Sequence, residues 1–170
     1  MAALVESGPF GFGKGTGSAT DFGGTWGLGF GVDFFRWLGL EARYVGIFNS
    51  GNSKVSQAGP VGLLTDGGEA FVRFTLPLPY VRPYLFGGVG YYDTHITGSL
   101  AAKTVSTLTN NDSLGFPMGV GVEVPLGWHF TLGAEATFRF LLSESFSNAP
   151  ARDIEGADYT TFSGVAKWHL

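Results

Sequence analysis

Alternation of apolar with small or polar residues runs through residues 115–140 and constrains the fold more than any other feature. In its first half the apolar positions are Phe116, Met118, Val120, Val122 and Val124, alternating with Gly115, Pro117, Gly119, Gly121 and Glu123. In its second half they are Phe130, Leu132, Ala134, Ala136, Phe138 and Phe140, alternating with Thr131, Gly133, Glu135, Thr137 and Arg139. Side chains of a β-strand point alternately to its two faces, so the pattern predicts a β-hairpin around a turn at residues 125–128.

The second face of this hairpin is mostly glycine, with a few large charged residues among the glycines. In a half-buried sheet of a soluble protein, that face would carry a mixture of Lys, Glu, Thr and Ser. Glycine beside large charged groups suits a cramped polar interior, and the apolar face then meets lipid. The pattern therefore favours a small membrane-spanning barrel over a soluble barrel of the lipocalin kind, whose apolar residues would line the inside.

The composition fits a chain that enters a membrane as strands. Charged residues make up 14% of the 170 residues, well below the roughly 25% of soluble domains. No apolar run approaches the ~18 to 20 residues of a membrane helix. The composition does not shift abruptly, so we expect a single domain over residues 1–170. The chain has no cysteine and a net charge of −4, which exclude a thiolate site and give no reason to expect a nucleic-acid partner.

Eight segments are expected to form strands: 3–14, 24–35, 38–48, 69–78, 83–96, 115–124, 130–140 and 159–170. The segment 83–96 has aromatic residues in both phases, and we expect Leu85, Val89 and Tyr91 to face outward. Three short connections alternate with four longer ones, which are 15–23, 49–68, 97–112 and 143–158. Short turns on one rim and long loops on the other are typical of outer-membrane barrels.

A resemblance to a known family rests on RPYLFGGVGYY at residues 82–92, on residues 115–140 and on a final strand with an aromatic residue near its end. In these features the chain resembles the eight-stranded outer-membrane barrels of the OmpA and OmpX type. The resemblance implies an all-β fold, a transmembrane antiparallel up-and-down β-barrel of eight strands in a Gram-negative outer membrane. These barrels usually end in Phe, whereas this chain ends in Leu170. Because the first residues do not form a secretory signal, we expect export through a signal peptide absent from this sequence.

The same resemblance implies partners and a role. The lipid bilayer is the expected partner, with lipopolysaccharide in its outer leaflet, and a protein partner in an envelope assembly is compatible with the architecture. The long loops imply adhesion, surface recognition or envelope structure. The alternatives are a narrow channel or a lateral path for small hydrophobic molecules, and a lipid-modifying enzyme of the outer membrane.

Charged residues at inward positions form the first candidate site: Asp33, Glu41, Arg43, Glu69, Arg73, Glu123, Glu135, Arg139 and Lys167. A functional interpretation is a proton relay or a catalytic carboxylate pair. The structural interpretation is that side chains fill a barrel of this size and that buried charges pair with one another. The near balance of acidic and basic groups favours the structural interpretation. A second candidate is an aromatic girdle at the short-turn rim, formed by Phe35, Trp37, Tyr80, Trp128 and Trp168.

Three further motifs give little support to an enzyme, a metal site or a phosphate loop. The histidines lie on different strands, at or near strand ends: His95, His129 and His169. Residues available to an acyl hydrolase are Asp93, His95, Ser143 and Ser145, but the sequence has no G-x-S-x-G nucleophile elbow. The glycines at 87, 88 and 90 are not followed by the Lys and Ser or Thr of a phosphate loop. We therefore expect a non-enzymatic protein with no cofactor and no metal.

The hairpin also predicts how the interior is filled. If Pro125 lies opposite His129, the inward pairs are Glu123 with Thr131, Gly121 with Gly133, Gly119 with Glu135 and Gly115 with Arg139. A shift of two residues would keep the faces and still place glycines beside large charged groups. We expect a polar core without a continuous pore, in which a Gly119→Ala substitution would crowd Glu135.

Overall fold

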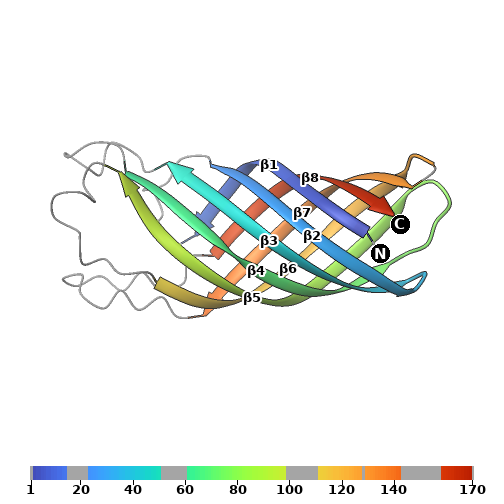
Figure 1. The fold of residues 1–170 in the computed structure, drawn as a ribbon, viewed down its shortest axis with the longest axis horizontal. Helices are drawn as coiled ribbons and strands as arrows, with labels where there is room; N and C mark the ends of the chain where they lie inside the picture. The colour runs from blue at the N-terminus through green and yellow to red at the C-terminus, as the bar shows by residue number, and fades with distance from the viewer. Residues whose placement is uncertain are drawn as a thin grey trace.

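Eight antiparallel strands close into a barrel in the computed structural model, which describes residues 2–14, 23–50, 61–98, 111–127, 129–142 and 158–169. The strands are β1 (Ala2–Lys14), β2 (Gly24–Phe35), β3 (Leu38–Ser50), β4 (Val61–Thr75), β5 (Arg82–Gly98), β6 (Asn111–Pro125), β7 (Phe130–Leu142) and β8 (Asp158–His169). Each pairs with its neighbour in sequence, and β8 pairs with β1 (Figure 1). The predicted eight-stranded up-and-down barrel is confirmed. The described residues contain no helix long and apolar enough to cross a membrane.

Apolar side chains point outward and polar or small ones point inward, as the alternation predicts. On β6, Phe116 and Val120 are about half exposed, whereas Glu123 is buried. On β5, Leu85 and Tyr91 lie on the outer surface, which confirms the side expected for this strand. Large exposed apolar residues occur on every strand from β2 to β8. An apolar surface of this extent requires an apolar environment.

The long connection predicted at residues 49–68 is wrong at both ends. β3 continues to Ser50 and β4 begins at Val61, and their pairing runs without a break as far as Ser50 opposite Gly62. The start of β4 was not recognised because consecutive leucines and consecutive glycines, at 63–64 and 67–68, interrupt its alternation. Similarly, β6 begins at Asn111 rather than at residue 115.

The register of the β6–β7 hairpin differs by two residues from the prediction. Pro125 lies opposite Thr131, not opposite His129. The other inward pairs include Glu123 with Gly133, Gly121 with Glu135, Gly119 with Thr137 and Pro117 with Arg139. Alternation alone cannot detect this shift, because moving the register by two residues leaves every side chain on its own face. The register is instead set by the turn, where Gly127 takes a φ of 88°, a conformation that glycine adopts readily.

Closure of the barrel between β1 and β8 is interrupted once. The pairing runs from Ala2 opposite His169 to Ser7 opposite Gly164, and resumes after a shift at Phe10. Pro9 lies in this interruption. Because proline has no backbone N–H to donate, the irregularity falls where a ladder hydrogen bond could not have formed.

The two rims of the barrel differ in the length of their connections. Residues 36–37, 76–81 and 126–129 join strands at one end, which we call the short-turn rim. The strand ends joined through residues 15–23, 51–60, 99–110 and 143–157 lie at the opposite end. Figure 1 places both chain termini at the short-turn rim.

Candidate functional site

Inward-pointing charged residues occupy the interior of the barrel. Eight of the nine candidate charged residues have 7% exposure or less: Glu41, Arg43, Glu69, Arg73, Glu123, Glu135, Arg139 and Lys167. The ninth, Asp33, lies near the short-turn rim with 46% of its side chain exposed. The structure divides them into an ion-pair cluster, formed by Asp33, Glu41, Arg43, Arg73, Glu123, Glu135 and Lys167, and a separate Glu69–Arg139 pair.

The centre of the ion-pair cluster is the contact between Arg43 and Glu135. Both terminal nitrogens of Arg43 donate to the Glu135 carboxylate, at 2.5 and 2.8 Å. The Glu135 carboxylate also accepts hydrogen bonds from Tyr84 and Thr137, each at 2.9 Å. Arg43 is on β3 and Glu135 on β7, four strands apart in a closed barrel of eight. The contact therefore joins opposite walls and crosses the lumen.

The rest of the cluster lies closer to the short-turn rim and shares its carboxylates. Arg73 donates to Asp33 at 2.7 Å and to Glu123 at 3.2 Å. Lys167 Nζ lies 3.2 Å from Glu123 and 3.7 Å from Glu41. Glu41 also accepts a hydrogen bond from Arg43 Nε at 2.7 Å. Each cation in the cluster thus contacts at least two carboxylates, which offsets much of the cost of its burial.

The Glu69–Arg139 pair lies further towards the opposite rim. Arg139 Nε lies 2.5 Å from one Glu69 oxygen, and Nη2 lies 3.3 Å from the other. Tyr92 donates to Glu69 at 2.7 Å, and Arg139 donates to Thr161 at 2.7 Å. Both charged side chains are fully buried.

Aromatic rings fill the space around the charged groups, and sequence analysis missed three of them: Tyr84, Phe86 and Tyr92. The Arg43 guanidinium lies over the Phe71 and Phe86 rings, 4.9 and 5.2 Å from their centroids. These two rings meet edge to face at 5.0 Å. The alternation of β5 could have identified them. If Leu85 and Tyr91 face outward, the adjacent residues Tyr84, Phe86 and Tyr92 must face inward.

The glycines of β6 make room for these rings. Gly121 lies opposite Tyr84 and Gly119 lies opposite Phe86 on β5. A methyl group added at Gly119 would meet the Phe86 ring and a backbone carbonyl. The expectation that it would crowd Glu135 is wrong, because the glycine row accommodates the aromatic residues of β5 on one side while Glu135 lies opposite Gly121 on the other.

A family model described as the outer membrane protein beta-barrel domain matches residues 5–169, almost the whole chain. The chain belongs to this outer-membrane β-barrel family. It is a protein of the bacterial outer membrane, and its apolar outer surface lies in the lipid bilayer. Short turns of such barrels face the periplasm and long loops face outward, so the short-turn rim is periplasmic.

Solved structures of other outer-membrane barrels share the fold. Neisserial surface protein A is similar with a TM-score of 0.64 at 12% identity, over 99% of this chain and 96% of that one. Ail of Yersinia pestis, the attachment invasion locus protein, has a TM-score of 0.57 at 11% identity, over 98% and 97%. The outer membrane enzyme PagL has a TM-score of 0.50 at 14% identity and full coverage of both chains. A comparison with curated protein sequences gave no match.

Four of the five aromatic residues expected at the membrane interface lie at the periplasmic rim of the outer-membrane barrel: Phe35, Trp37, Tyr80 and Trp168. The first two stack on each other with ring centroids 5.5 Å apart, and Trp37 also stacks on Phe74 at 6.2 Å. All four are at least half exposed. The fifth, Trp128, lies outside the described residues.

The residues considered for a metal site or a hydrolase are not assembled in the described part of the barrel. His129 and His169 lie at the periplasmic rim, where His169 shares a 3.0 Å hydrogen bond with Thr131. The side chain of His95 lies outside the described residues, as do Ser143 and Ser145. Among the described residues, no group of three His, Asp or Glu side chains is arranged to hold a metal ion.

Proposed function

We propose that this chain is a non-enzymatic, plugged barrel that anchors long external connections for surface recognition or adhesion, with a contribution to envelope structure. The observation that carries the proposal is the contact between Arg43 and Glu135 across the lumen. Side chains that join opposite walls narrow the lumen, which supports a plugged barrel. Phe71, Phe86 and Tyr84 fill the space beside this contact.

The chemistry of the interior favours a structural filling over a relay or a catalytic site. Glu135 receives four hydrogen bonds, from Arg43, Tyr84 and Thr137, so its oxygens are occupied by protein donors. Catalysis requires a group that can reach a substrate. A carboxylate held in this way, with no exposed side-chain surface, offers no such access.

The strand connections support a recognition function on the outside of the cell. Strand ends that are joined by residues 15–23, 51–60, 99–110 and 143–157 all lie on the external rim. These segments are rich in Gly, Ser, Thr and Asn. Loops held on a rigid scaffold commonly carry binding function in proteins. The partners we propose are lipopolysaccharide or a protein at the cell surface.

Measuring ion conductance in a planar bilayer tests whether the side chains in the lumen block the barrel. We expect no steady conductance from folded protein, and we expect Gly119→Ala to leave conductance at the background level. Folding is checked by gel mobility before and after boiling. Reproducible, ion-selective single-channel steps from folded protein would contradict the plug and favour the narrow channel.

Shortened connections test the location of function. Replacing residues 51–60, 99–110 and 143–157 by tight turns leaves all eight strands intact, whereas the wider cut at 50–66 would remove part of β4. The entropy cost of closing a loop changes little with loop length, so shortening the loops should leave the barrel able to fold. It should lose binding of whole cells to host cells or matrix. Full binding by a folded, shortened barrel would place the function elsewhere.

A further inference from the structure

An open cavity of about 970 Å³ lies at the periplasmic rim and has an excess of positive charge. Its charged lining consists of three arginines and two carboxylates, Arg36, Arg73, Arg82, Asp33 and Glu123, together with His169. Arg73 contacts both carboxylates. Within the described residues, Arg36 and Arg82 form no ion pair. The chain as a whole has a net charge of −4, so the cavity is positively charged whereas the whole molecule is negatively charged.

A second feature, an apolar groove of about 570 Å³, lies on the outer wall at the same rim. It runs over β4, β5 and β6 between Trp37, Phe74, Leu85 and Val120, with Gly121 in the lining. Trp37 and Leu85 are 50% and 56% exposed. This wall lies in the bilayer, so the groove can take part of a lipid molecule.

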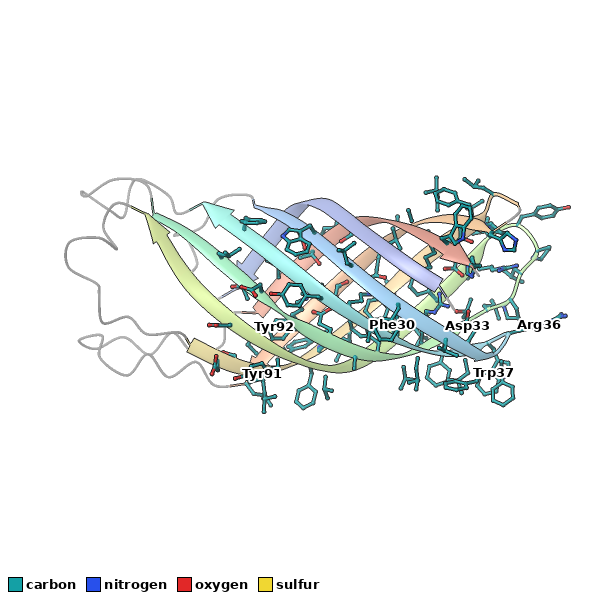
Figure 2. All side chains as sticks on the ribbon, viewed as in Figure 1. Phe30, Asp33, Arg36, Trp37, Tyr91 and Tyr92 are labelled. Carbon is teal, nitrogen blue, oxygen red and sulfur yellow. The ribbon has the colours of Figure 1, made fainter. Side chains whose placement is uncertain are left out.

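The groove and the cavity meet along the rim. Thr75 lines both of them. At three places a residue of the groove directly adjoins a residue of the cavity in sequence: Trp37 with Arg36, Leu76 with Pro77 and Pro83 with Arg82. Figure 2 shows Arg36 extending past the end of the barrel, on the same turn as Trp37. Apolar and cationic surfaces therefore share one edge at the depth where phospholipid headgroups lie.

We propose that this edge is a binding site for an anionic phospholipid of the periplasmic leaflet. One acyl chain lies in the groove beside Trp37 and Leu85, and the phosphate is held by Arg36 and Arg82. Arginine presents paired donors that match a phosphate group. A soluble phosphate ester would use the cavity alone, whereas the phospholipid also accounts for the apolar groove that adjoins it.

Tryptophan quenching tests the proposal in vesicles. A variant that keeps Trp37 and has Trp26, Trp128 and Trp168 replaced by Phe is inserted into phosphatidylcholine vesicles. Either phosphatidylglycerol or phosphatidylcholine with brominated acyl chains is then added in increasing fraction. We expect brominated phosphatidylglycerol to quench Trp37 at the lower fraction, with a preference of about fivefold for each arginine. A matched variant that keeps Trp168, which lies on β8 outside the groove over β4, β5 and β6, should show little preference.

Substitution of the arginines completes the test. The preference at Trp37 should disappear in R36Q/R82Q and persist in R36K/R82K, which retains both charges. Arg152→Gln removes the same charge from a connection on the external rim and should leave the preference unchanged. Gel mobility before and after boiling identifies folded samples. Equal quenching by both lipids, the same preference at Trp168, or a preference that survives in folded R36Q/R82Q would each overturn the proposal.

Discussion

Two regions of the barrel interior neutralise buried charge in different ways. In the ion-pair cluster near the periplasmic rim, Glu41 contacts Arg43, Arg73 and Lys167. In the Glu69–Arg139 pair, one arginine meets one carboxylate, with support from Tyr92 and Thr161. The cluster distributes each charge over several partners, so losing one contact leaves others in place. In the pair, Nε and Nη2 of Arg139 both contact the same Glu69 carboxylate, so one substitution removes both contacts, and we expect this region to be the more sensitive.

The largest effect is expected from Glu69→Gln. The substitution removes the Glu69 carboxylate from the buried Arg139, and breaking a buried ion pair in this way costs about 3 to 5 kcal/mol. The free energy of unfolding in guanidinium chloride, measured from lipid vesicles, checks it. Replacing both residues by Leu should recover much of the loss. If Glu69→Gln costs less than substitutions in the ion-pair cluster, the comparison fails.

The comparison assumes that only the inner face tolerates charge. Leu132 is on the outer face of β7 and 44% exposed. Arg at a mid-strand position such as Val120 on β6 should cost about 2 to 4 kcal/mol, and Leu132→Arg, two residues from the start of β7, should cost less. Its inward neighbour gives the matched variant, because Thr131→Arg would fail by crowding His169 rather than by exposure to lipid. Equal tolerance of Arg at Val120 and at a connection position such as Ser106 would contradict the assignment of faces.

Glu41→Gln probes the redundancy of the ion-pair cluster directly. Arg43 keeps Glu135, and Arg73 keeps Asp33 and Glu123. We therefore expect a loss of roughly 1 to 3 kcal/mol, smaller than that of Glu69→Gln in the same unfolding assay. Conductance in a planar bilayer should stay at background, since the contact between Arg43 and Glu135 remains. A loss as large as that of Glu69→Gln would show that the cluster is not redundant.

The smallest effect concerns the packing of Phe86, which lies against Arg43 of the ion-pair cluster. A methyl group at Gly119 would meet both the Phe86 ring and the backbone carbonyl oxygen of Ala136. Overpacking of this kind costs typically about 1 to 3 kcal/mol, because the Phe86 ring can shift whereas the Ala136 carbonyl is fixed in the strand ladder. Gly68→Ala is the control, because nothing lies within 4 Å of the added methyl group. Equal unfolding free energies of the two variants would contradict the close packing of Phe86.

Alternation in the sequence was sufficient to predict the barrel and the faces of its strands, because a period of two is a property of every strand. It did not predict the register of β6 and β7, where Gly127 and the turn decide between two arrangements with identical faces. It also missed the first residues of β4, whose paired leucines and glycines obscure the period.

The charged residues of the interior could be named from the sequence, but their partners could not. Arg43 lies opposite Glu69 in the β3–β4 ladder, which suggests a pair between neighbouring strands. In the structure Arg43 instead reaches Glu135, and Glu69 binds Arg139. Which charges meet across the lumen depends on the three-dimensional closure of the barrel and on rings such as Phe71 and Phe86 that pack against Arg43.

The seam between β1 and β8 has a consequence for how the protein is made. These strands are the first and the last of the barrel, so the seam cannot form until β8 has been synthesised. Before then, β1 and the last strand present open edges, and unpaired backbone groups at such an edge are costly in lipid. Biogenesis must therefore either insert the sheet and seal it in one concerted step, or supply a temporary strand from another protein to cover the free edge.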